Sequence, residues 1–178
     1  IRESGFPSRR ARMRRPAKAI HPVAGILALV WMCIIFAFSA QDRQESGAVS
    51  EGVSYELVSS TGFLFHLNLD EDQIREIAGS IERTVRKAAH MTEYAILAVL
   101  FYVWLGTWQF RRWRRQLLAV AMAAAYAASD EFHQLFVEGR AGRVSDVLID
   151  SAGALVGVGI CTLCIWLHRR RRQRRKTE

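Results

Sequence analysis

Cysteine is scarce in this chain and poorly placed for cross-linking. The 178 residues include three cysteines, Cys33, Cys161 and Cys164, and all three lie in apolar stretches. The polar stretches contain none, so the sequence does not imply a disulfide framework. Cys161 and Cys164 have the spacing of a redox pair. They lack the helix-start, solvent-accessible setting that activates a thiol, so we expect no redox function from them.

Metal-binding motifs and linkers are missing too. The sequence has no HExxH or comparable spacing, although His90, His133 and several carboxylates are ligand types that zinc or another divalent ion would take. We therefore predict no metal and no cofactor. No internal repeat and no long linker rich in proline or glycine interrupts the chain, and its length is that of one domain.

Carboxylates are almost missing from three basic stretches. These stretches cover residues 2–18, 111–115 and 169–176, hold most of the lysines and arginines, and include only Glu3. Four apolar segments lie between them, and ~20 residues suffice to cross the hydrocarbon of a bilayer. We predict spans at about 23–40, 91–110, 115–131 and 147–167. The third is short, so a buried or re-entrant helix is its alternative.

The basic stretches also predict the topology. Cytoplasmic loops collect lysine and arginine, and four spans with both termini in the cytoplasm place all three basic stretches on that side. The predicted fold class is therefore all-α, a four-helix transmembrane bundle. It comprises a basic cytoplasmic N-terminus (1–22), a membrane domain (23–167) and a basic cytoplasmic tail (168–178).

Both termini have an alternative interpretation. The basic start, the apolar run and Ala40 also fit a signal peptide. Phe38, however, occupies a position where cleavage prefers a small residue, and the run is too long, so we favour a retained span. The basic tail fits a topological anchor that attracts anionic lipid, and we expect no nucleic-acid partner.

Residues 41–87 form the only substantial segment expected outside the bilayer. Its second half predicts an amphipathic extracytoplasmic helix, because Asp70 can cap it and Ile74, Ile77, Ile81 and Val85 recur at helical spacing. The opposite face carries Glu76, Glu82, Arg83 and Arg86. The first half predicts only a short helix over 49–58.

Polar residues gather at the predicted outer ends of the spans. Three groups each share one helix face: Lys87, His90 and Tyr94; Asp130, His133 and Gln134; and Asp146, Asp150, Gly153 and Gly157. The two glycines are small enough to let another helix approach closely. Ionisable residues at membrane depth are costly unless they are paired or hydrated, so we expect an inward-facing site.

The residue types indicate candidate roles. His133 or His90 would be the base, since imidazole titrates near neutral pH, and an adjacent Asp could orient it. The candidate catalytic residues are His133, His90, Asp130 and Glu131. The candidate ligand-binding residues are Ser39, Gln41, Lys87, Tyr94, Gln134, Arg140, Asp146 and Asp150. Lys87, Arg140 and Arg143 could hold a phosphate or carboxylate. A purely structural ion-pair network is the alternative, whereas a proton pathway lacks a continuous relay.

Three stretches resemble the VanZ-like family of bacterial membrane proteins. They are FSAQDRQ at 38–44, RKAAHMTEYAIL at 86–97 and SDEFHQLFVEGRAGRVSDVLIDSAGALVG at 129–157. The family pattern falls on Ser39, Gln41, Lys87, His90, Tyr94, Asp130, Glu131, His133, Gln134, Arg140, Asp146, Gly153 and Gly157. Asp150 departs from it, because the family commonly has Asn there, and the change adds a titratable charge.

The resemblance implies a small multi-span protein associated with low-level resistance to teicoplanin-type glycopeptides, but it provides no mechanism. We therefore carry two hypotheses. In the first, a protein of the bacterial cytoplasmic membrane uses an outward-facing site to bind an anionic lipid, a cell-wall precursor or a glycopeptide, with membrane lipids as its other partners. In the second, it is a membrane-embedded hydrolase or transferase that acts on a lipid-linked envelope substrate by His/Asp acid–base chemistry. The sequence leaves this choice open.

Overall fold

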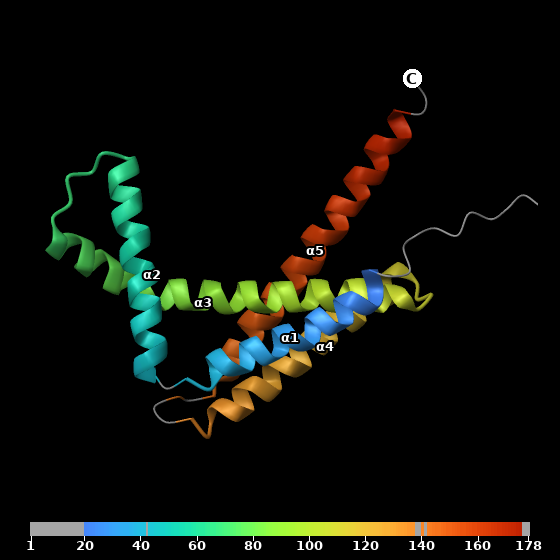
Figure 1. Cartoon of the computed structure of the whole chain (residues 1–178), viewed down its shortest axis with the longest axis horizontal. Coiled ribbons are helices and arrows are strands. Elements are labelled where there is room, and N and C mark those ends of the chain that lie inside the picture. Colours follow the sequence, from blue (N-terminus) through green and yellow to red (C-terminus); the bar gives the residue numbers. More distant parts are fainter. Residues whose placement is uncertain (1–19, 42, 138–139, 141, 176–178) are drawn as a thin grey trace, which may run out of the picture.

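The computed structural model describes residues 20–41, 43–137, 140 and 142–175, and its regular elements are helices. In chain order these are α1 (Ile20–Ser39), α2 (Arg43–Leu64), α3 (Glu71–Trp104), the 3₁₀ turn η2 (Leu105–Thr107), α4 (Arg112–Gln134) and α5 (Val144–Arg174) (Figure 1). The described residues contain no strand, so the predicted all-α class is confirmed. The predicted basic N-terminus up to residue 19 and residues 176–178 of the tail lie outside the described part.

Three helices are long and apolar enough to cross a membrane. They occupy His21–Ser39, Glu71–Thr107 and Val144–Arg174. Large apolar side chains such as Ile26, Leu29 and Leu155 are exposed on them, as expected for a surface that faces lipid. The chain is therefore a membrane protein. The apolar part of α4 is shorter, between Arg115 and Asp130, so the bundle of four spans remains a prediction.

The amphipathic helix and the second span, which were predicted as separate elements, form one continuous helix, α3. The sequence analysis had separated an amphipathic helix beginning at Asp70 from a span at 91–110. The start is as predicted: Asp70 is the N-cap and forms a capping box with Gln73. No glycine or proline occurs between Gly79 and Gly106, so nothing breaks the helix where it passes from its charged half into its apolar half.

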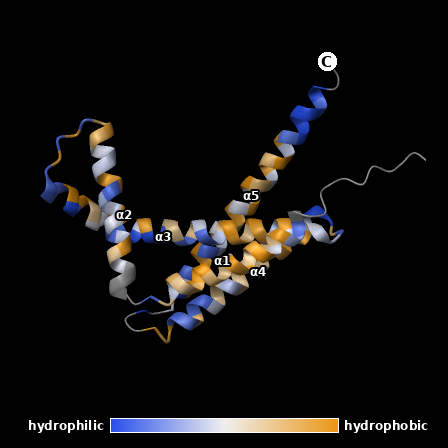
Figure 2. Cartoon of the chain, in the orientation of Figure 1, coloured by the Kyte–Doolittle hydropathy of each residue, from blue (hydrophilic) through white to orange (hydrophobic). Residues whose placement is uncertain are grey.

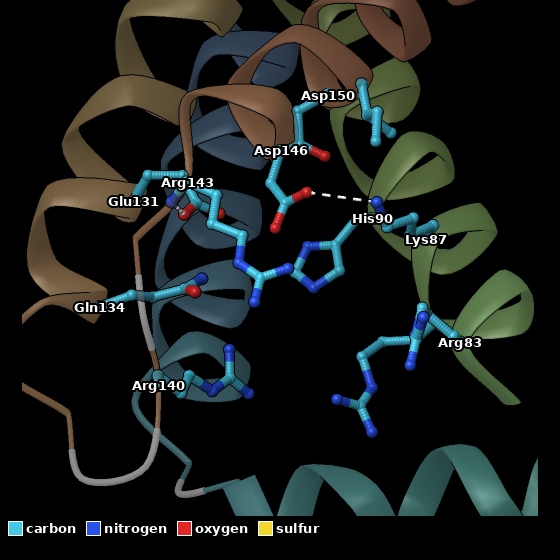
Figure 3. A pocket seen from close by; sticks show the side chains of 11 residues that line it. Arg83, Lys87, His90, Glu131, Gln134, Arg140, Arg143, Asp146 and Asp150 are labelled. Atoms are coloured by element: carbon cyan, nitrogen blue, oxygen red, sulfur yellow. Dashed lines mark hydrogen bonds and ion pairs between the residues drawn. The ribbon is translucent and has the colours of Figure 1, made fainter.

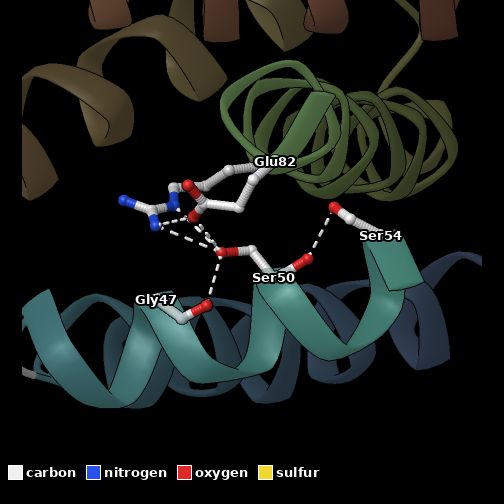
Figure 4. Close-up of polar contacts among 5 residues, drawn as sticks. Gly47, Ser50, Ser54 and Glu82 are labelled. Carbon is white, nitrogen blue, oxygen red and sulfur yellow. Dashed lines mark hydrogen bonds and ion pairs between the residues drawn. The ribbon is translucent and has the colours of Figure 1, made fainter. Parts of the chain in front are cut away.

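Helix α2 lies across the charged half of α3 (Figure 1). It covers residues 43–64, well beyond the short helix predicted over 49–58. A polar cluster joins the two helices (Figure 4): Ser50 Oγ donates to Glu82 Oε1 at 2.6 Å, and Arg86 donates both to Ser50 and to Glu82. Ser54 is fully buried at the same contact and donates to the carbonyl of Ser50.

Helix α5 crosses α3 with the two backbones in close contact. A Cβ atom added to Gly153 would lie 2.3 Å from the carbonyl oxygen of Met91, and one added to Gly157 would lie 2.6 Å from that of Ala95. Only glycine fits such a crossing. The prediction that these glycines face another helix is confirmed, and the crossing fixes Asp146 and Asp150 of α5 beside α3.

Helix α3 forms the centre of the packing. Figure 2 shows apolar residues concentrated where α1, α3 and α4 lie together, and hydrophilic residues at the end of α5 and in the first half of α3. Tyr94 and Leu97 of α3 are buried against small residues of the neighbouring helices, such as Ala123, Ala127 and Ala154. Small residues on α4 and α5 allow these two helices to pack closely against α3.

Candidate functional site

The middle of α3, the C-terminal end of α4 and the N-terminal end of α5 surround a polar pocket of about 300 Å³, which we call the cationic pocket (Figure 3). Its wall contains Arg83, Arg86, Lys87, His90, Glu131, Gln134, Arg140, Arg143, Asp146, Ile149 and Asp150. Helix α3 supplies the first four, α4 the next two, the connection between α4 and α5 two arginines, and α5 the rest. Segments far apart in the sequence therefore converge on one hollow.

Basic side chains outnumber carboxylates among the described residues of this wall. Five basic side chains line it, together with three carboxylates. Lys87 Nζ lies 3.4 Å from Asp146 Oδ1, and Arg86 pairs with Glu82, which lies outside the wall. Arg83, Arg140 and Arg143 bring further positive charge to the same wall. Guanidinium groups form paired hydrogen bonds to phosphate and carboxylate, so the wall suits an anionic group.

Glu131 lines the pocket and holds part of its wall in place. Its side chain is buried, and its Oε2 accepts a hydrogen bond from the backbone nitrogen of Arg143 at 2.8 Å. Gly142 packs against the same residue, since a Cβ there would lie 2.3 Å from the Glu131 carbonyl oxygen. These contacts hold the end of the α4–α5 connection against α4. The geometry therefore supports a positioning role for Glu131, which the sequence analysis had placed among the catalytic candidates.

A buried polar chain links α4 to the end of α1. Gln134 Nε2 donates to Ser39 Oγ at 3.0 Å and to Asp130 Oδ2 at 3.3 Å. All three side chains are buried. Ser39 and Asp130, both predicted as site residues, thus lie behind the pocket wall, with Gln134 between them and the hollow. They support the wall and do not line it.

Three buried polar side chains lie at or behind the pocket wall. Asp130, Asp150 and Tyr94 are at most 3% exposed, Tyr94 interacts with Asp130, and Oδ1 of Asp150 has no hydrogen-bond partner among the described residues. Asp130 is close enough to act electrostatically on Tyr94 and Asp150. Buried polar groups are normally hydrogen-bonded, and exceptions concentrate at sites that bind something.

The two candidate histidines occupy different environments. His90 lines the cationic pocket, and its Nδ1 lies 3.8 Å from Glu93 Oε2. His133 lies outside the walls of the pocket and packs its ring against Phe36 of α1, with 4.6 Å between ring centroids. If the site uses a histidine base, His90 is therefore the better placed of the two.

The structure brings most of the predicted site residues together. Seven line the cationic pocket: Lys87, His90, Glu131, Gln134, Arg140, Asp146 and Asp150. Tyr94, Ser39 and Asp130 lie behind its wall, Gln41 lines a neighbouring pocket, and His133 faces α1. Among the described residues, no three His, Cys, Asp or Glu side chains converge as metal ligands.

Arg83 and Arg86 line the pocket but were not among the predicted site residues, because they were expected on the polar face of a separate amphipathic helix. Their signal was present, because Arg83, Lys87 and His90 follow i, i+4 and i+7 and therefore share a face. The predicted helix boundary near residue 88 prevented that face from being extended backwards. With α3 continuous, these arginines belong to the same wall as His90.

Comparison with known proteins identifies a family. The model of the VanZ/LLP1 family matches residues 24–166, which extend from α1 into α5 and include the whole wall of the cationic pocket. Neither a curated protein nor a solved structure gives a match.

Proposed function

The chain belongs to the VanZ/LLP1 family, and we propose that it is a membrane protein that binds the anionic group of a cell-envelope molecule in the cationic pocket. One observation carries this proposal: among the described residues, five basic side chains from α3 and the α4–α5 connection line one hollow together with three carboxylates. An anion would neutralise the excess charge, and the arginine forks match phosphate or carboxylate. The ligand classes are an anionic lipid, a cell-wall precursor or a glycopeptide.

We place the pocket on the outer side of a bacterial cytoplasmic membrane. The basic residues 111–115 follow the other end of α3, and the basic residues 169–175 are at the far end of α5. The positive-inside rule puts those ends in the cytoplasm, so the pocket faces out. Helix α4 then returns from the inner to the outer side. Its 23 residues amount to about 35 Å, which is enough for a fourth span.

A matched pair of arginine variants tests the proposal. Arg83→Gln removes one charge from the pocket wall, whereas Arg75→Gln removes one from an exposed turn of the same helix, where Arg75 faces Glu71. We expect Arg83→Gln to weaken binding of methyl phosphate about tenfold, since hydrogen bonds to charged groups contribute ~1.5–3 kcal/mol. Arg75→Gln should bind like the wild type. Calorimetry on the protein in phosphatidylcholine nanodiscs measures both, and equal affinities of the two variants would contradict the proposal.

His90 favours a second candidate function, a hydrolase or transferase acting on a lipid-linked envelope substrate. Its imidazole lies on the pocket wall, where a substrate could reach it, and its buried Nδ1 lies 3.8 Å from Glu93 Oε2. His90→Asn should then abolish turnover of a lipid-linked phosphate ester and keep its binding. His133→Asn is the control and should keep both. If the wild type binds this ester without turning it over, the enzyme hypothesis is wrong and the binding function remains.

A further inference from the structure

A second pocket, the side pocket, adjoins the cationic pocket. It has a volume of about 240 Å³ and lies between α2, the C-terminal end of α1 and the middle of α3. Its apolar lining comes from Phe38 of α1, Val49 and Val53 of α2, and Val85 and Ala89 of α3, and Gln41 and Glu93 add polar groups to this wall. Val49 and Val53 are one helical turn apart, so one face of α2 covers this space.

Three residues belong to the walls of both pockets: Arg86, His90 and Arg140. They mark a shared boundary at which charge gives way to apolar surface. Arg140 extends from the α4–α5 connection to the end of α1, where its Nη2 donates to the carbonyl of Phe38 at 3.5 Å. A single molecule that reaches past these three side chains would therefore place a charged group on one side and an apolar group on the other.

Helix α2, which covers the side pocket, is held on α3 by the hydrogen bond from Ser50 to Glu82. Ser50 lies between Val49 and Val53 in the turn of α2 that packs on α3, and its bond to Glu82 fixes this turn over the side pocket. Leu57 continues the apolar stripe of α2 by one more turn but lies outside the pocket wall, and it is about as exposed as Val49 and Val53. The side pocket is thus a defined space, bounded by a braced helix.

We infer that the ligand is an anionic lipid of the membrane, a phosphate ester whose phosphate lies in the cationic pocket and whose first methylenes lie in the side pocket. The inference rests on the proposed function and adds the class of ligand to it. Charge complementarity selects the phosphate, and the apolar lining beyond Arg86 and His90 selects the chain. Phe38 of α1 lines the side pocket and is half exposed, so the rest of the chain can continue from there into surrounding lipid.

The test compares two phosphate esters that differ only in chain length, octyl phosphate and methyl phosphate. Val53→Trp fills the side pocket, whereas Leu57→Trp makes the same change outside it. In phosphatidylcholine nanodiscs, we expect Val53→Trp to bind octyl phosphate about tenfold more weakly than the wild type and methyl phosphate equally well. Leu57→Trp should match the wild type for both. Partitioning of octyl phosphate into the bilayer affects every variant alike, so it does not alter these ratios.

The outcomes separate this inference from the proposed function. If Val53→Trp and Leu57→Trp bind octyl phosphate equally while Arg83→Gln still weakens methyl phosphate, the pocket takes a soluble anion and the lipid assignment is wrong. If Arg83→Gln has no effect on either ester, the proposed function itself fails.

A labelling experiment makes the test independent of how the variants fold. An octyl phosphate with a diazirine on its chain should label wild-type peptides containing Phe38 or Val53, and unlabelled octyl phosphate should compete where octanol does not. Labelling confined to the lipid-facing surfaces of α1 and α5, or competed equally by octanol, would overturn the assignment.

Discussion

Lys87 and Asp146 join α3 to α5 at the edge of the cationic pocket, with Nζ of Lys87 3.4 Å from Oδ1 of Asp146. The two side chains are 44% and 34% exposed, so solvent screens the pair and it contributes less than about 1 kcal/mol to stability. Its main consequence is electrostatic, because Asp146 offsets part of the positive charge that would otherwise face a bound anion.

The Lys87–Asp146 pair predicts opposite effects on anion binding for two substitutions that each remove one charge. Asp146→Asn should strengthen binding of methyl phosphate severalfold, since it removes a negative charge from the wall, and Lys87→Met should weaken it. Both should lower the thermal unfolding temperature only slightly. Titration calorimetry gives the affinities. Equal weakening by both variants would show instead that the ion pair mainly maintains the packing of α3 on α5.

The α3–α5 crossing predicts a large difference between two glycines of one helix. Gly153→Ala would place a methyl group 2.3 Å from the Met91 carbonyl oxygen, a backbone atom that cannot turn aside. We expect a loss of about 1–3 kcal/mol in the free energy of unfolding, as for other overpacked sites. Gly159 has open space where its Cβ would lie, so Gly159→Ala should be neutral or stabilising.

Unfolding of both variants in the same detergent measures the difference. Equal stability of Gly153→Ala and Gly159→Ala would mean that the two helices can separate at little cost.

The contact between α2 and α3 predicts a local effect on dynamics. Ser50→Ala removes the hydroxyl that donates to Glu82 and leaves this carboxylate with Arg86 alone. Hydrogen bonds to charged groups contribute ~1.5–3 kcal/mol, so amides of α2 should exchange faster by one to two orders of magnitude.

Ser80→Ala is the control, because Ser80 bonds only within α3, to the carbonyl of Ile77, and is exposed. Its α2 amides should exchange at the wild-type rate. Unchanged exchange in Ser50→Ala would show that apolar contacts alone hold α2.

The sequence predicted the parts of the site that depend on one helix and missed those that depend on how helices meet. The Asp70 cap and the glycine face of α5 follow from local geometry and are as expected. His133 shows the limit: helical spacing places it on one face with Asp130 and Gln134 but cannot tell which of the three side chains reaches the pocket. The ring of His133 lies against Phe36, whereas Gln134 bonds to Ser39 and also lines the pocket.

Asp150, which lines the cationic pocket, allows a prediction about both stability and anion binding. Its side chain is 2% exposed, its Oδ1 has no hydrogen-bond partner among the described residues, and four carboxylates, Asp130, Glu131, Asp146 and Glu93, act on it electrostatically. Asp150→Asn keeps the shape, removes a group that burial and these neighbours make costly to ionise, and adds an amide that can donate to a neighbour. We expect the free energy of unfolding to rise by about 1–3 kcal/mol, because a buried unsatisfied group costs that much.

The exposed Asp72 provides the control, since Asp72→Asn changes the same charge at the start of α3 without relieving any burial. It should bring no gain in stability, because an acidic residue in the first turn is itself mildly favourable. Asp150→Asn should bind methyl phosphate at least as tightly as the wild type, since the pocket wall loses a group that can become negatively charged. Chemical unfolding and calorimetry on one preparation test both effects. A destabilised Asp150→Asn would show that this carboxyl is protonated and donates a hydrogen bond, which would make it a partner of the ligand and not a source of repulsion.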